Sequence, residues 1–197
     1  FTIEGQKSYW GDKCSDRYRK PSKASRQPVI EDLLAYREQL LQDVTGLNLK
    51  ATQPKLATGK PNVGILRTMG GFERLVFWVR YLHEIGAHVV LSPQTDARIA
   101  AKGVEIAVAQ PCYPIQVAHG HAWWLIEAGV DYLFVPNLLD AENHEASQCV
   151  AHFCPWNQTL PFVLRSAPGL HTFRDRFLHP RIHFHLGRDH VKQAMAE

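Results

Sequence analysis

Hydrophobic and polar positions form a repeating pattern from residue 62 to the end of the chain. Short runs that are almost continuously apolar alternate with stretches in which apolar residues recur at helical spacing. Strands buried on both faces give such continuous runs, because helices cover both sides of a parallel sheet. The expected strands are NVGILR (62–67), AHVVLSP (87–93), VEIAVA (104–109), DYLFVPNLL (131–139) and RIHFHL (181–186).

The stretches between these runs predict helices, and their ends carry typical boundary residues. Gly86 and Gly129 stand at the ends of two of them, where a glycine commonly stops a helix. Pro114 and Pro155 open two others, because proline fits the first helical turn. The expected helices lie at residues 72–86, 95–103, 114–129, 155–167 and from 188 onward.

This alternation predicts an α/β fold: a Rossmann-like open, mostly parallel sheet with helices on both faces. We expect it to occupy residues 61–197. Residues 1–60 are expected to form an irregular N-terminal segment with one amphipathic helix at about residues 29–42. The chain begins at Phe1 rather than at a methionine, so we expect it to be a fragment of a larger chain.

Composition narrows the class of protein. Of the 197 residues, 45% are apolar and 21% charged, as in a globular protein with a packed core. No apolar run approaches the roughly 20 residues that cross a membrane, and residues 1–10 lack the pattern of a signal peptide. We therefore expect a cytoplasmic protein without membrane contacts. A net charge of +3, with one interrupted basic cluster at residues 13–26, predicts no nucleic-acid partner.

Two of the four cysteines, Cys112 and Cys154, fall where the expected fold could use them. Each lies between an expected strand and a proline that opens a helix, so both are expected at the sheet edge where open α/β folds bind ligands. The N-terminus of a helix favours a thiolate, which is the form that ligates metals and iron–sulfur clusters. A single reactive cysteine, or a pair of small buried thiols, fits the same spacing, and the residues alone leave all three interpretations open.

The histidines give less direct indications. His119 and His121 are about 200° apart around a helix, so we expect one to turn inward and the other outward, without a shared metal. His183 and His185 share one face of an expected strand, where we expect an ordinary polar face rather than a zinc pair. The turn at residues 67–74 has two glycines but matches neither a dinucleotide-binding nor a Walker motif, so no ATPase signature is present.

Four segments resemble a known family. VGILRTMGGFERLVFWVRYLHEIGAHVVLSPQT (63–95) is similar to the opening of the domain found in acyl-CoA dehydratase activase-related proteins. PCYPIQVAHGHAWWLIEAGVDYLFVPNLL (111–139) resembles the family's Cys-Tyr/Phe-Pro run, its His-Gly-His and its Gly-Val-Asp strand. CPWNQTLPFVLR (154–165) resembles a Cys-Pro segment, and GDKCSDRYRK (11–20) loosely resembles an upstream Gly-Asn-Arg-Cys element.

The resemblance implies a protein of the 2-hydroxyacyl-CoA and 2-hydroxyglutaryl-CoA dehydratase activator group. Dehydratase-like subunits of that group hold iron–sulfur cubanes through cysteines, and the activator couples ATP hydrolysis to low-potential electron transfer. It implies that Cys112 and Cys154 are metal ligands and that Cys14 is a further cluster-binding residue, whereas Cys149 has no counterpart. The implied function is an iron–sulfur redox module that passes electrons to an acyl-CoA dehydratase-like partner, or to other domains of its own parent chain.

The chain also departs from the family's pattern. Ala109, Gln110 and Gln116 replace residues typical of the family, and the ATPase module is absent. A cubane normally takes four ligands, so the remaining ones are expected beyond this chain or on a partner. Any activity is expected to need the full-length protein or a partner.

Two other functions stay open at this point. One is a cofactor-free α/β binding or scaffolding domain whose cysteines are structural. The other is a hydrolase or transferase in which Cys112 is the nucleophile and His119 the base.

Overall fold

The computed structural model describes residues 2–3, 6–7, 30–142 and 150–196. The chain divides into two compact units, Phe1–Tyr36 and Arg37–Glu197. In the first, β1 (Thr2–Ile3) and β2 (Gln6–Lys7) pair in antiparallel fashion. The four-stranded sheet, the β6–β8 sheet and the candidate sites described below all belong to the second unit.

The first long helix, α1 (Leu33–Thr45), begins and ends slightly later than the helix expected at about residues 29–42. Its start is set by Asp32, whose Oδ1 accepts hydrogen bonds from the backbone N–H groups of Leu34 at 3.0 Å and Ala35 at 3.1 Å. A side-chain oxygen at this position satisfies amide groups that have no partner inside the helix. Asp32 is therefore the N-cap of α1.

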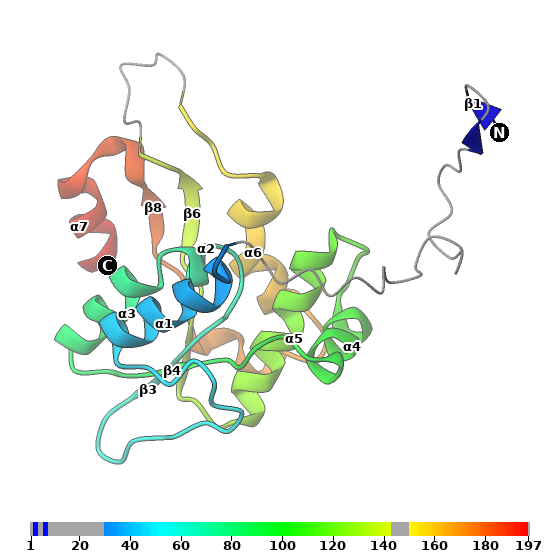
Figure 1. Cartoon of the computed structure of the whole chain (residues 1–197). Helices are drawn as coiled ribbons and strands as arrows, with labels where there is room; N and C mark the ends of the chain where they lie inside the picture. The colour runs from blue at the N-terminus through cyan, green and yellow to red at the C-terminus, as the bar shows by residue number, and fades with distance from the viewer. Residues whose placement is uncertain (1, 4–5, 8–29, 143–149, 197) are drawn as a thin grey trace. The chain divides into compact units, whose positions relative to one another are not determined.

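Four parallel strands form the central sheet in the order β4 (His88–Leu91), β3 (Asn62–Ile65), β5 (Tyr132–Phe134) and β7 (Phe177–Leu178) (Figure 1). Parallel neighbours need a connection that returns across a face of the sheet, and helices supply it here. The expected open, mostly parallel α/β fold is therefore confirmed. The extent of the domain, from residue 61 to 197, stays a prediction.

The other helical elements are α2 (Met69–Glu73), α3 (Leu75–Glu84), α4 (Ala97–Ile106), α5 (Tyr113–Glu127), α6 (Pro155–Ser166) and α7 (Arg188–Ala196), with the 3-10 turns η1 (His171–Arg176) and η2 (Phe184–Leu186). No helix in the described part of the chain is long and apolar enough to cross a membrane.

Two hydrophobic cores show that helices cover the sheet on both faces. In one core, Trp78 of α3 packs against Phe134 of β5, with ring centroids 5.2 Å apart. In the other, Leu125 of α5 and Leu164 of α6 pack with Leu133, the neighbour of Phe134 on the same strand. Successive residues of a strand point to opposite faces, so β5 contributes to both cores. This double burial explains why the strand sequences are almost continuously apolar.

A second, smaller sheet pairs β6 (Asn137–Asp140) with β8 (Arg181–His183) in parallel, and Figure 1 shows the two strands side by side near α7. The single strand expected over residues 131–139 is therefore wrong, because β5 ends at Phe134 and β6 begins a new sheet. Pro136 lies at the break, and a proline has no N–H to donate to a neighbouring strand.

The expected strand at residues 104–109 is also wrong. Its first three residues complete α4, and the rest forms no strand. Val104 and Val108 are exposed, whereas Ile106 is buried, so the run is apolar without being a buried strand. Cys112 thus follows a helix and a loop rather than a strand.

Two glycines bring α4 and α5 into direct backbone contact. A methyl group added to Gly103 would lie 2.2 Å from the carbonyl oxygen of Gln116, and one added to Gly120 would lie 2.0 Å from that of Ile99. Both distances are far below a van der Waals contact, and backbone atoms cannot rotate away as a side chain can. The crossing of α4 over α5 therefore requires glycine at both positions.

Gly120→Ala tests this requirement. Helix propensity alone would make the substitution stabilising by roughly 0.5–1 kcal/mol, but the clash with a backbone carbonyl should make it destabilising by about 2–3 kcal/mol or more. Urea unfolding measures the change in the free energy of unfolding. The exposed Ala101→Gly on α4 is the matched control, expected to lose about 1 kcal/mol from propensity alone. A Gly120→Ala protein as stable as the parent would contradict the close contact.

Candidate functional site

Cys112 and Cys154 occupy equivalent places, as the N-cap residues of α5 and α6, with Pro114 and Pro155 in the first turns. Both cysteines are exposed and free, and neither side chain makes a capping hydrogen bond. The interpretation as small buried thiols is therefore wrong. Neither packing nor helix capping uses these two thiols.

The two helices also share an orientation relative to the sheet. α5 leads directly into β5, and α6 leads through η1 into β7, which pairs in parallel with β5. A helix that connects parallel strands runs back toward their starting ends, so its own N-terminus lies at the edge where the strands end. α5 and α6 contact each other, and their N-terminal cysteines therefore lie toward the same edge of the sheet. The other expected cluster residue, Cys14, lies outside the described residues, as does Cys149.

His119 and His121 are both completely buried in α5, so the expectation that one would face outward is wrong. Nδ1 of His119 lies 2.8 Å from the carbonyl oxygen of Ile115, and Nε2 of His121 lies 3.0 Å from Oγ1 of Thr95. Contact with α4 on one side and with the sheet core on another leaves little of α5 facing solvent. The two rings thus have separate partners and no common ligand position.

Burial keeps both rings neutral. The pKa of His121 is lowered from 6.5 to about 4, chiefly because burial removes the ring from solvent; the nearby charge of Arg67 adds to this shift, and Asp96 opposes it. Burial also lowers the pKa of His119, although its hydrogen bond to the Ile115 carbonyl works in the other direction. His119 makes no hydrogen bond to Cys112 in the described structure, so the geometry does not supply the base that a Cys112 nucleophile would need.

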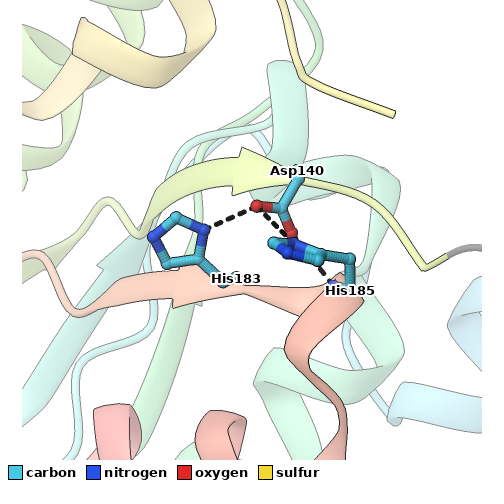
Figure 2. Close-up of side chains that lie close together, drawn as sticks. All are labelled: Asp140, His183 and His185. Atoms are coloured by element: carbon cyan, nitrogen blue, oxygen red, sulfur yellow. Dashed lines mark hydrogen bonds and ion pairs between the residues drawn. The ribbon is translucent and has the colours of Figure 1, made fainter. Parts of the chain in front are cut away.

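A second group of polar side chains meets in the small sheet (Figure 2). Oδ2 of Asp140 lies 2.6 Å from Nδ1 of His183 and 2.8 Å from Nδ1 of His185. Asp140 Oδ1 accepts a hydrogen bond of 3.0 Å from the backbone N–H of His185. Asp140 is completely buried and the two imidazoles are partly exposed. One carboxylate oxygen and two ring nitrogens thus converge, as ligands of a cation would.

Two backbone irregularities produce this convergence. The pairing of β6 with β8 passes from Leu138 opposite Ile182 to Asp140 opposite His183, so Leu139 is an extra residue in a β-bulge. A bulge re-aims the side chain beside it. η2 begins directly after His183 and brings His185 to the same carboxylate. The expected continuous strand over residues 181–186 is therefore wrong, because its second half is a 3-10 turn.

Sequence reasoning noted the spacing of His183 and His185 but missed Asp140. Asp140 is 43 positions away from His183, and only the pairing of β6 with β8 brings them together. The available signal was a single acidic residue directly after an apolar run, which is too common to point to a site. The surroundings of Asp140 also set its pKa: burial works to raise it, but the backbone N–H of His185 and the two nearby imidazoles together hold it below its ordinary value.

Buried His121 should make the protein less stable in mild acid. The unfolded chain takes up a proton near pH 6.5, whereas the folded chain resists it down to a pKa of about 4, so the stabilising difference is fully present above pH 6.5 and is lost as the pH falls toward 4. At pH 5 the loss from this one residue should be about 2 kcal/mol relative to pH 7.5. Urea unfolding at the two pH values should show a smaller difference in His121→Gln than in the parent.

His171→Gln is the matched substitution for that experiment, because it replaces an exposed histidine with the same residue. The difference between the two pH values should fall more in His121→Gln than in His171→Gln. A His121→Gln protein with the same difference as the parent would show that His121 is not responsible.

Comparison with protein families matches residues 62–197 to the family described as the CoA enzyme activase uncharacterised domain (DUF2229). No curated protein and no solved structure gave a match. The matched segment spans more than half of the chain and includes the central four-stranded sheet, the β6–β8 sheet, Cys112 and Cys154, and the Asp140 cluster. It confirms the resemblance to acyl-CoA dehydratase activase-related proteins that the sequence suggested, and the chain therefore belongs to the CoA enzyme activase uncharacterised domain family.

Proposed function

We propose that this domain is the iron–sulfur redox module of an activase-related protein. In this proposal Cys112 and Cys154 bind a cubane cluster, with Cys14 as a further cluster-binding residue. The module takes part in low-potential electron transfer to an acyl-CoA dehydratase-like partner or to other domains of its own parent chain. The observation that carries the proposal is the placement of two exposed thiols, used by neither packing nor capping, at the N-caps of two contacting helices.

The local chemistry suits a thiolate-held cluster. Free N–H groups and the partial positive charge at a helix N-terminus stabilise the negative charge of a thiolate and of a cluster. The prolines that follow each cysteine remove one N–H apiece but fix the direction in which each helix starts. Because both thiols are exposed, a cluster or a partner protein can reach them without unfolding of the core.

The number of ligands implies help from elsewhere. A cubane takes four ligands, commonly cysteines, and within the described residues only Cys112 and Cys154 are cysteines. Cys14 and ligands from a partner or another domain would complete the set. When bound, the cluster would supply one-electron transfer at low potential, while the residues of this chain hold it at the edge of the sheet.

The cofactor-free alternative has less support. A structural cysteine is normally buried as a small apolar side chain, whereas both of these are exposed. A general binding or scaffolding role would leave no reason for two cysteines at N-cap positions, where serine, threonine, aspartate and asparagine stabilise a helix better.

Cys112→Ser and Cys154→Ser separate these functions. Serine is the better N-cap, so each variant should be at least as stable as the parent, within about 0.5 kcal/mol. Cluster ligation should fail, since it needs the thiolate. The parent is purified without oxygen and reconstituted with iron and sulfide, and its visible absorption, iron and acid-labile sulfide are measured.

We expect a brown parent protein and a nearly colourless Cys112→Ser/Cys154→Ser double variant with unchanged unfolding. A parent that takes up no iron and sulfide, or a double variant that takes up as much as the parent, would refute the proposed site. Urea unfolding of the same samples is the control, because it shows that any loss of colour does not come from loss of the fold.

A further inference from the structure

The meeting of Asp140, His183 and His185 has a use that the proposed redox function does not provide. Their three potential ligand atoms, one from each side chain, lie within 4.8 Å of one another. Among the residues that the structure describes, this is the group of three acidic, histidine or cysteine side chains that could surround one metal ion. Figure 2 shows the carboxylate between the two rings, with both rings turned toward it.

Burial of Asp140 gives the first reason to look for a cation. Its side chain is inaccessible to solvent, and both of its oxygens lie within 3.0 Å of nitrogen atoms, so the carboxyl group is placed as an acceptor. A charge removed from water is costly unless an opposite charge lies beside it. The side chains that contact its oxygens are the two imidazoles, so the positive charge must come from a protonated ring or from a bound ion.

An unused ring nitrogen gives the second reason. Nδ1 of His185 is shielded from solvent and has no hydrogen-bond partner in the described structure, although it lies 2.8 Å from Oδ2 of Asp140. Its ring is near the carboxylate but makes no hydrogen bond to it, whereas Nδ1 of His183 does so at 2.6 Å. A buried polar atom without a partner is costly. A metal ion among the three atoms would accept the lone pair of this nitrogen.

A second hydrogen bond fixes the orientation of the Asp140 carboxylate, as is common for carboxylates that bind metals. Oδ1 accepts the backbone N–H of His185, which leaves Oδ2 directed at the rings. Ligating carboxylates in metal sites are commonly fixed by such a second hydrogen bond. The β-bulge at Leu139 and the turn η2 preorganise the same three side chains through the backbone.

The donor set indicates which kind of ion would bind. Two imidazoles and one carboxylate suit Zn²⁺ or Fe²⁺, whereas Mg²⁺ and Ca²⁺ prefer oxygen ligands alone. Three protein ligands leave at least one coordination position for a fourth ligand. His183 also lines a cavity of about 930 Å³ together with His190, whose ring centroid lies 5.6 Å from that of His183. The cavity therefore borders the cluster at His183.

We propose that Oδ2 of Asp140 and the Nδ1 atoms of His183 and His185 bind one divalent transition-metal ion, Zn²⁺ or Fe²⁺. Ligands about 2.0 Å from a tetrahedral ion are roughly 3.3 Å apart. The observed separations of 2.6 and 2.8 Å from Oδ2 thus need to widen by about 0.5–0.7 Å. The site involves neither Cys112 nor Cys154 and is independent of the cluster proposed above.

Calorimetric titration with Zn²⁺ tests the site in the full chain after removal of metals with a chelator. The Cys112→Ser/Cys154→Ser background is used, so that these thiols cannot capture the ion. We expect one tight Zn²⁺ per chain in this background. His183→Gln and His185→Gln should each weaken it by about 100-fold or more, because even substitutions outside the ligands weaken metal binding roughly 10- to 100-fold. The exposed His171→Gln is the matched control and should bind as tightly as its background.

Two further measurements keep the result independent of folding. Circular dichroism confirms that the His183→Gln and His185→Gln proteins are folded, and Co²⁺ replaces Zn²⁺ so that visible absorption reports the ligands around the ion. The expected result is a Co²⁺ spectrum that is lost in both variants and kept in His171→Gln. Absence of one-to-one binding in the Cys112→Ser/Cys154→Ser background, or equal affinity in all three histidine variants, would overturn the proposal. Anaerobic competition between Fe²⁺ and Zn²⁺ then shows which of the two ions the site prefers.

Discussion

Direct contact between the backbones of α4 and α5 is the constraint on which the rest of the central fold depends. Gly103 and Gly120 allow it, because any side chain there would meet a carbonyl oxygen of the other helix. The contact encloses the middle of α5 between α4 and the core on the sheet. His119 and His121 flank Gly120 in the chain and are therefore buried with it. The same packing fixes the position of α5, and with it the place of Cys112 at the N-terminus of this helix.

Buried polar side chains, His121 and Asp140, make hydrogen bonds to other segments at two places in the fold. His121 reaches Thr95 next to the start of α4, where Asp96 caps the helix by accepting the N–H of Ile99 at 2.7 Å. Asp140 joins β6 to β8 through the His183 ring nitrogen and to η2 through the backbone amide of His185. The contact between His121 and Thr95 and the contacts of Asp140 join segments that are distant in sequence, so they depend on the finished fold. The neutral histidine in α5 needs only a hydrogen-bond partner, whereas the charged carboxylate in the small sheet also needs a positive charge beside it.

The two candidate sites use different parts of the architecture. Cys112 and Cys154 belong to helix starts, where a side chain projects from the body of the protein and remains accessible. Asp140, His183 and His185 belong to a bulge and a 3-10 turn, where the backbone leaves regular pairing and turns side chains inward. Helix starts can be recognised from a proline and its neighbours, whereas a bulge leaves no comparable mark in the sequence. This difference explains why sequence reasoning placed the cysteines at helix starts but did not place Asp140 beside the two histidines.

The sequence by itself determined the parallel α/β class, the helix starts at Pro114 and Pro155, and the two cysteines beside them, because hydrophobic spacing and boundary residues are local properties of the chain. Because these signals are local, they also led to wrong predictions. VEIAVA has the composition of a strand, yet α4 continues to Ile106, which is buried while Val104 is exposed, as on one face of a helix that packs on the protein. The two-residue strand β7 is too short to give a pattern of its own. Only the tertiary structure decided that both helix histidines are buried and that Asp140 meets His183 and His185, since strand pairing and helix contact join residues that no local pattern connects.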